Sequence, residues 1–262
     1  MIWRRLFSFV VIGGFLSAAA CAAEIKVMTS GAFTAAYRQL VPQFEHTTHD
    51  KITTAYGASM GNAPDSIPRR LQRGEPVDVV ILAAPALDQL IKQGKVVAGS
   101  RVDLVRSSIG MAVRAGASKP DIRSIDALKR TLLAAKSIAY SDSASGAYLS
   151  QELFPRLGIA EQIKGKCKRI ADQPVAAVVA RGDAEIGFQQ VSELLPVVGI
   201  DYVGELPPGA QKVTTFSAGI ATSAKQPDAA RALIEFFASP EAQHAIIKSG
   251  LEPIAQQAHQ TR

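Results

Sequence analysis

A regular alternation of short β-rich runs with helical runs begins at residue 24 and constrains the fold more than any other feature. Strands are expected at 24–30, 51–59 and 77–83, and helices at 31–48, 66–74 and 84–96. In the first of these helices, Phe33, Tyr37, Leu40 and Phe44 recur at the spacing of one buried helix face. The order β-α-β-α-β-α favours an open α/β sheet.

The alternation resumes after residue 106 and continues to residue 251, so the chain holds two α/β units in series. Further strands are expected at 107–117, 137–142, 166–173, 184–190, 201–206 and 212–222, and helices at 124–135, 146–157, 174–183, 191–197 and 227–251. Ser124 is expected to cap the first of these helices. No flexible linker separates the units, which suggests two lobes that share a cleft, with ligands bound at the carboxyl ends of the strands.

The first 23 residues have the layout of a secretory signal peptide. Two arginines come before the apolar run Leu6–Leu16, and small residues follow. The apolar run is shorter than the roughly 20 residues that a membrane-spanning helix needs, so cleavage after Ala22 or Ala23 is expected. A lipid anchor at Cys21 is the minor alternative. The protein is expected in the bacterial periplasm, since one unpaired cysteine, Cys167, would remain after cleavage.

Charge and motifs exclude several classes of function. The formal net charge is +6, but the basic residues are scattered and not interleaved with aromatic residues, so nucleic-acid binding is not expected. No nucleotide-binding glycine motif, phosphate-binding loop or nucleophile elbow occurs. His46 and His49 have metal-ligand spacing without a third ligand, which indicates a polar helix end. The sequence therefore predicts a protein that is not an enzyme and has no cofactor or metal ligands, while the role of Cys167 stays open.

Polar loops follow five of the expected strands. They contain Ser30–Gly31, Ser59–Asn62, Ser143–Ala147, Gln173–Val175 and Gln189–Gln190. Each loop alone is an ordinary helix start, and the third is expected to cap its helix as well as face the cleft. Together they would bring hydroxyl groups and helix N-termini to one cleft, which suits an anion held by neutral donors.

These segments make the chain resemble the periplasmic molybdate-binding proteins of ABC transporters, within the type II solute-binding family. The matching segments include "VMTSGAFTAAYRQL", "SASGAYLSQELFPRLGI" and "PVAAVVARGDAEIGF". The resemblance implies two α/β lobes with a ligand cleft between them. It divides the chain into a first lobe, 24–105 plus 215–262, and a second lobe, 106–214, with hinge strands where the chain crosses.

The resemblance also implies the ligand-binding residues. The hydroxyls of Ser30 and Ser59, the backbone N–H groups of Ser145 and Val175, and Gln190 at the position of a family tyrosine would donate to the ligand. Gly146 keeps the family pattern beside Ser145. The expanded loop after Ser59 departs from the family and adds further candidates: Met60, Asn62 and Arg69.

The family default is a receptor that captures molybdate or tungstate and delivers it to an inner-membrane ABC permease. The altered loops keep a small organic acid open as the ligand, since arginine binds carboxylates in a bidentate manner. A sensory or enzymatic protein on the same fold is the alternative from another class. No nucleic-acid partner is expected, and the receptor is expected to be a monomer.

Overall fold

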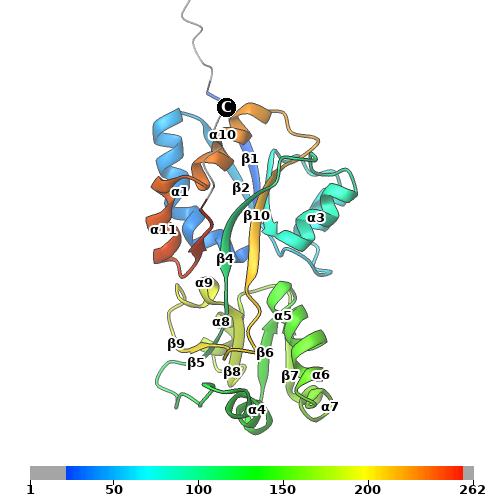
Figure 1. The fold of residues 1–262 in the computed structure, drawn as a ribbon, viewed down its shortest axis with the longest axis vertical. Coiled ribbons are helices and arrows are strands. Elements are labelled where there is room, and N and C mark those ends of the chain that lie inside the picture. The colour runs from blue at the N-terminus through cyan, green and yellow to red at the C-terminus, as the bar shows by residue number, and fades with distance from the viewer. Residues whose placement is uncertain (1–21, 256–262) are drawn as a thin grey trace, which may run out of the picture.

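The computed structural model describes residues 22–255, which fold into two α/β lobes stacked along the long axis of the molecule (Figure 1). The predicted fold class, two α/β lobes with sheets flanked by helices, is confirmed, and both sheets are mixed. The predicted signal peptide and Cys21 lie outside the described residues.

The first lobe is built on a six-stranded sheet with the strand order β11-β4-β10-β3-β1-β2. Its strands are β1 (Glu24–Thr29), β2 (Lys51–Tyr56), β3 (Val79–Ala83), β4 (Val102–Ser107), β10 (Thr214–Ile220) and β11 (Glu252–Pro253). β1 pairs in parallel with β2 and β3, whereas β10 runs antiparallel to β3 and β4. β3 is buried along its whole length, as its unbroken apolar run predicts.

The second lobe is built on a five-stranded sheet with the strand order β7-β6-β8-β5-β9. Its strands are β5 (Ile109–Arg114), β6 (Ile138–Ser141), β7 (Cys167–Ile170), β8 (Ile186–Gln190) and β9 (Ile200–Glu205). β6 is parallel to both β7 and β8, and β5 is antiparallel to β8 and β9. The carboxyl ends of β6, β7 and β8 therefore point to one edge, where the chain turns into helices or loops.

Helices cover both faces of each sheet. They are α1 (Gly31–Thr48), α2 (Ile67–Gln72), α3 (Ala84–Lys92), α4 (Ile125–Ala134), α5 (Ala144–Tyr148), α6 (Phe154–Arg156), α7 (Ala160–Ile163), α8 (Val175–Ala180), α9 (Val191–Leu194), α10 (Pro227–Phe237) and α11 (Gln243–Lys248). The Ser124 hydroxyl accepts the Ala127 N–H at 3.1 Å, so the predicted cap of α4 is confirmed. The helix expected at 146–157 begins earlier, at Ala144, and changes to a π-helical turn at Leu149–Leu153.

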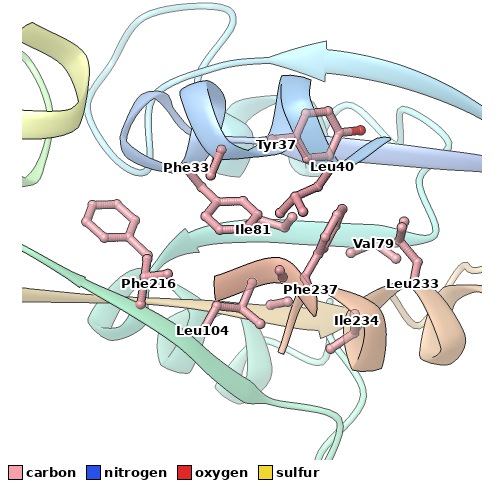
Figure 2. Packing of buried hydrophobic residues seen from close by; sticks show 14 of the residues in the cluster. Phe33, Tyr37, Leu40, Val79, Ile81, Leu104, Phe216, Leu233, Ile234 and Phe237 are labelled. Carbon is pink, nitrogen blue, oxygen red and sulfur yellow. The ribbon is translucent and has the colours of Figure 1, made fainter. Parts of the chain in front are cut away.

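Packing of α1 against α10 forms the core of the first lobe. Figure 2 shows Phe33 and Leu40 on the side of α1 that faces Phe237 of α10, and the rings of Tyr37 and Phe237 have centroids 5.6 Å apart. The rings of Phe33 and Phe237 meet edge to face, with centroids 5.4 Å apart. Burying each such side chain contributes about 1.5–3 kcal/mol to folding. This packing fixes the direction of α1, whose N-terminus reaches the space between the lobes.

The chain crosses between the lobes after β4 and again before β10. β4 ends at Ser107 and β5 begins in the other sheet at Ile109, while the return runs from the end of β9 to Thr214. These crossings lie close to the boundaries that the resemblance implies, 105/106 and 214/215. The division into lobes at those residues and the hinge motion remain predictions. Within residues 22–255, no helix combines the length and the apolar character that crossing a membrane requires.

Candidate functional site

A cavity of about 230 Å³ lies between the two lobes. Residues that directly follow strands of both sheets line it, among them Ser30 after β1, Gly57 after β2, Asp142 after β6 and Ala171 after β7. Parallel strands bring their carboxyl ends to a common edge, which is where open α/β sheets bind ligands. The cavity is therefore the candidate site.

The N-terminus of α1 forms one wall of the cavity. Ser30 is the N-cap residue, but its hydroxyl does not cap the helix. Ser30 is 2% exposed, and within the described part of the chain its hydroxyl oxygen has no hydrogen-bond partner. A buried hydroxyl without a partner costs free energy, so this group is suited to a ligand.

Four further serines line the cavity: Ser59, Ser141, Ser143 and Ser145. The Ser59 oxygen accepts the N–H of Ala83 at 2.9 Å, which leaves the hydroxyl proton available for donation. The Ser141 and Ser145 hydroxyls lie 3.0 Å apart, and either can donate to the other. The structure thus places Ser30, Ser59 and Ser145 around one cavity, together with Gln190.

Two groups expected to donate to the ligand have protein partners instead. The Val175 N–H donates to the Gln189 side-chain oxygen at 3.0 Å, and Val175 does not line the cavity. With its amide oriented so that the nitrogen meets acceptors, Gln190 donates to the backbone oxygens of Ser107 and Ser108. Gln190 therefore ties α9 to the crossing between the lobes.

Gly146 and Ser143 also have roles within α5. A β-carbon on Gly146 would lie 1.7 Å from the Ser141 backbone oxygen, so Gly146 permits the close turn between β6 and α5. Ser143 occupies the N-cap position, but neither it nor Ser145 makes a side-chain capping hydrogen bond. Gly146 itself does not line the cavity.

The loop after Ser59 lies beside the cavity, and its three candidate residues do not line it. Met60 packs against an apolar cluster that includes Ile67 and Leu71 of α2. The Asn62 N–H donates to the Asp142 carboxylate across the lobes at 3.4 Å. Arg69 is exposed and donates to the side chains of Asn62 and Gln72, each at 3.3 Å.

Glu193 is one of the cavity residues that the sequence did not reveal. It lies in the first turn of α9, is half-buried and lines the cavity. Burial raises the pKa of Glu193 to about 7, while a hydrogen bond from Gln189 acts in the opposite direction. An acidic residue in the first turn of a helix usually faces solvent, so the sequence held no signal for this carboxyl group.

Acidic side chains outnumber basic ones around the cavity. Asp65, Asp142 and Asp172 line it with Glu193, whereas its described lining includes no lysine or arginine. Arg169 pairs with Asp142 at 3.4 Å from outside the lining. Within residues 22–255, no cluster of histidine, cysteine and acidic residues could hold a metal ion. A ligand in the cavity would therefore meet hydroxyl and backbone N–H donors, and no lysine or arginine of the described lining.

Comparison with known proteins extends this description. The profile of bacterial extracellular solute-binding proteins matches residues 25–252. An aconitate isomerase from a Pseudomonas species is 48% identical over 242 residues, which are 92% of this chain and 92% of that protein. A molybdate-binding protein of Azotobacter vinelandii is 30% identical over 242 residues, 89% of this chain and 91% of that protein. A solved periplasmic molybdate-binding protein of the same organism has a TM-score of 0.70 at 20% identity and covers 89% of this chain and 100% of that one.

These similarities confirm the resemblance to molybdate-binding proteins, but they overturn the prediction that the chain is not an enzyme. The relative that is 48% identical carries the name of an enzyme. That prediction rested on the absence of nucleophile motifs and metal-ligand clusters from the sequence. A single carboxyl group in a cavity belongs to no such motif, so this search could not detect it. The chain belongs to the family of bacterial extracellular solute-binding proteins.

Proposed function

We propose that the chain is an isomerase that interconverts cis- and trans-aconitate in the cavity between its lobes. The aconitate isomerase that is 48% identical supports this substrate. The single observation that carries the proposal is Glu193, a carboxyl group of raised pKa that lines the cavity. A receptor that only binds an anion has no need of such a group, whereas an enzyme that moves a proton does.

The cavity offers suitable donors for a carboxylate ligand. Ser30 presents an unpartnered hydroxyl at the N-terminus of an 18-residue helix, and Ser59 has a hydroxyl proton to donate. A helix N-terminus attracts negative charge through its free N–H groups. These donors would hold the carboxylates of aconitate without a lysine or arginine in the lining.

The chemistry of aconitate calls for an acid-base group. Aconitate is a propene that carries three carboxylates, and its isomers differ in the arrangement about the double bond. Removing a proton from its methylene carbon leaves an electron pair that is delocalised over the allyl system and the neighbouring carboxylate. Returning the proton to the other end of that system forms a new double bond. A group with a pKa near the working pH is best suited to both steps, and the pKa of Glu193 is about 7.

A receptor for molybdate, tungstate or another small organic acid, working with an ABC permease, is the second candidate. The neutral donors and the 30% identical molybdate-binding protein favour it. Glu193 weighs against a receptor that only binds, because such a receptor uses no group that transfers a proton. Both candidates share the proposed periplasmic location, which fits the signal peptide expected at residues 1–23.

The experiment is to incubate the purified protein separately with cis-aconitate and with trans-aconitate and to follow isomer composition by proton NMR. We expect both samples to reach the same mixture at rates proportional to protein concentration. Calorimetric titrations with molybdate and tungstate run in parallel. Unchanged isomers together with tight binding of either oxyanion would refute the isomerase and support the receptor.

A further inference from the structure

The side chain of Gln189 connects Glu193 to the backbone of another helix. Its nitrogen Nε2 donates to Glu193 Oε2 at 2.6 Å, and its oxygen Oε1 accepts the Val175 N–H at 3.0 Å. Gln189 is 4% exposed, so water does not compete freely for these bonds. The Val175 N–H can only donate, and it therefore fixes which end of the amide faces the carboxyl group.

The two oxygens of Glu193 have different surroundings. Oε2 accepts the hydrogen bond from Gln189 and also lies against Gly31 of the other lobe. A β-carbon at Gly31 would be 2.2 Å from Oε2 and 3.4 Å from Oε1, so a larger residue there would displace the carboxyl group from its present position. Oε1 accepts no hydrogen bond from the described residues, which leaves it free to exchange a proton with a ligand.

We propose that Gln189 is a positioning residue that holds Glu193 Oε2 and thereby presents Oε1 to the substrate. This inference rests on the proposed isomerase function and names the atoms that transfer the proton. Oε1 takes the proton from the substrate carbon, and the electron pair of the broken C–H bond stays on the substrate. Glu193 then returns the proton to the substrate, so the carboxyl group ends in its starting form and no other reactant is needed.

The groups around Glu193 allow the effect of Gln189 to be isolated. Asp65, Asp142, Asp172 and Tyr56 are the other ionisable side chains of the described lining, and Arg169 pairs with Asp142. Burial raises the pKa of Glu193, and the hydrogen bond from Gln189 lowers it. That hydrogen bond stabilises the ionised carboxylate, so its loss should raise the pKa of Glu193 further.

The test compares the wild type with Gln189→Met, which has a similar length but cannot donate or accept in the same way. Infrared spectroscopy follows the protonated Glu193 carboxyl band, which is assigned by its absence in Glu193→Gln. We expect this band to persist to higher pH in Gln189→Met. We also expect the acidic limb of kcat/KM for aconitate to move to higher pH and kcat to fall by about 10- to 100-fold, as misplaced catalytic groups cause.

Gln211→Met is the matched control. Gln211 also accepts a backbone N–H and donates to a backbone oxygen, both of Ile109, but it lies outside the cavity lining. A general loss of stability should affect both variants, whereas only Gln189→Met should shift the titration. If Gln189→Met does not fold, Gln189→Glu is the second variant, since it keeps an acceptor for the Val175 N–H. It also places a second acid beside Glu193, which should raise the pKa of Glu193 as well.

An unchanged Glu193 titration in a folded Gln189 variant would overturn the positioning role. Failure of the wild type to isomerise aconitate would refute the proposed function instead. The infrared titration needs no substrate, so it decides the role of Gln189 in either case.

Discussion

Two helices begin beside each other at the cavity, one from each lobe, and they bring opposite chemistry to it. α1 has Ser30 at its N-cap and no acidic residue in its first turn, whereas α9 carries Glu193 in its first turn. The Ser192 hydroxyl donates to the Ala32 backbone oxygen at 2.7 Å and joins the two helix starts. The α1 side offers donors to an anion, while the α9 side offers a group that can gain or lose a proton.

The comparison also shows which electrostatic effect dominates at Glu193. An acid at a helix N-terminus is usually stabilised by about 0.3–1 kcal/mol, which would lower its pKa. The pKa of Glu193 is instead raised from 4.5 to about 7 by burial. At about 1.4 kcal/mol per pKa unit, the burial effect exceeds the helix effect, and α9 is only four residues long. An acidic residue in the first turn of a helix thus has a raised pKa, rather than a lowered one, when it is buried.

The largest expected effect comes from removing the proton-carrying group on the α9 side. Glu193→Gln should lower the turnover of aconitate by about 10²- to 10⁴-fold, because the amide cannot act as a general base. Steady-state assays at neutral pH measure the effect. Glu161→Gln is the control: Glu161 is exposed on α7 and pairs with Lys164, so turnover should not change. Equal turnover in wild type and Glu193→Gln would remove Glu193 from the chemistry.

The next effect concerns stability and pH. Because the pKa of Glu193 is raised on folding, from 4.5 to about 7, the folded state holds its proton more tightly than the unfolded state. Its contribution to stability is therefore present below the unfolded pKa and is lost as pH rises through the folded pKa. Relative to Glu193→Gln, the wild type should lose about 2–3 kcal/mol between about pH 4 and pH 8. Urea denaturation across this range measures the difference, and a constant difference would contradict the raised pKa.

The α1 side should affect binding more than turnover. Ser30→Ala removes a hydroxyl that has no partner among residues 22–255 and should weaken binding by about 1 kcal/mol while stability stays unchanged. Ser59→Ala should lower both the binding free energy and the free energy of unfolding by about 1–3 kcal/mol, because it also leaves the N–H of Ala83 without its acceptor. Calorimetry and denaturation on both variants separate these effects. Equal losses of stability in the two variants would contradict the finding that Ser59 accepts a backbone N–H whereas the Ser30 hydroxyl has no partner among the described residues.

The smallest effect is expected outside the cavity. Arg69 is exposed and does not line the site, so Arg69→Gln should change ligand affinity by less than about twofold, as surface substitutions usually do. Titration at two salt concentrations measures the affinity. A tenfold loss would place Arg69 in the liganded site and contradict the view that neutral donors hold the anion.

Local sequence patterns predicted the fold and the α1 side of the cavity well. Phe33, Tyr37, Leu40 and Phe44 recur at helical spacing, and all four are buried. Ser30 follows an apolar strand directly, and sequence order alone brings such a residue to the edge of a parallel sheet.

The α9 side could not be predicted in the same way, because its properties come from distant parts of the chain. Glu193 is enclosed by Gly31 of the other lobe, and Val175 is bonded to Gln189. Neither contact leaves a local pattern. The resemblance to molybdate-binding proteins implied that the Val175 N–H donates to the ligand, whereas in this chain it donates to the side chain of Gln189.

The most direct test of the division between the two helix starts is the affinity of Glu193→Gln for trans-aconitate, measured by calorimetry at neutral pH. If α1 and its neighbouring serines hold the carboxylates while Glu193 moves the proton, this variant should bind as tightly as the wild type or more tightly, since a charge that repels the ligand is gone. Loss of binding in a correctly folded Glu193→Gln protein would contradict the account.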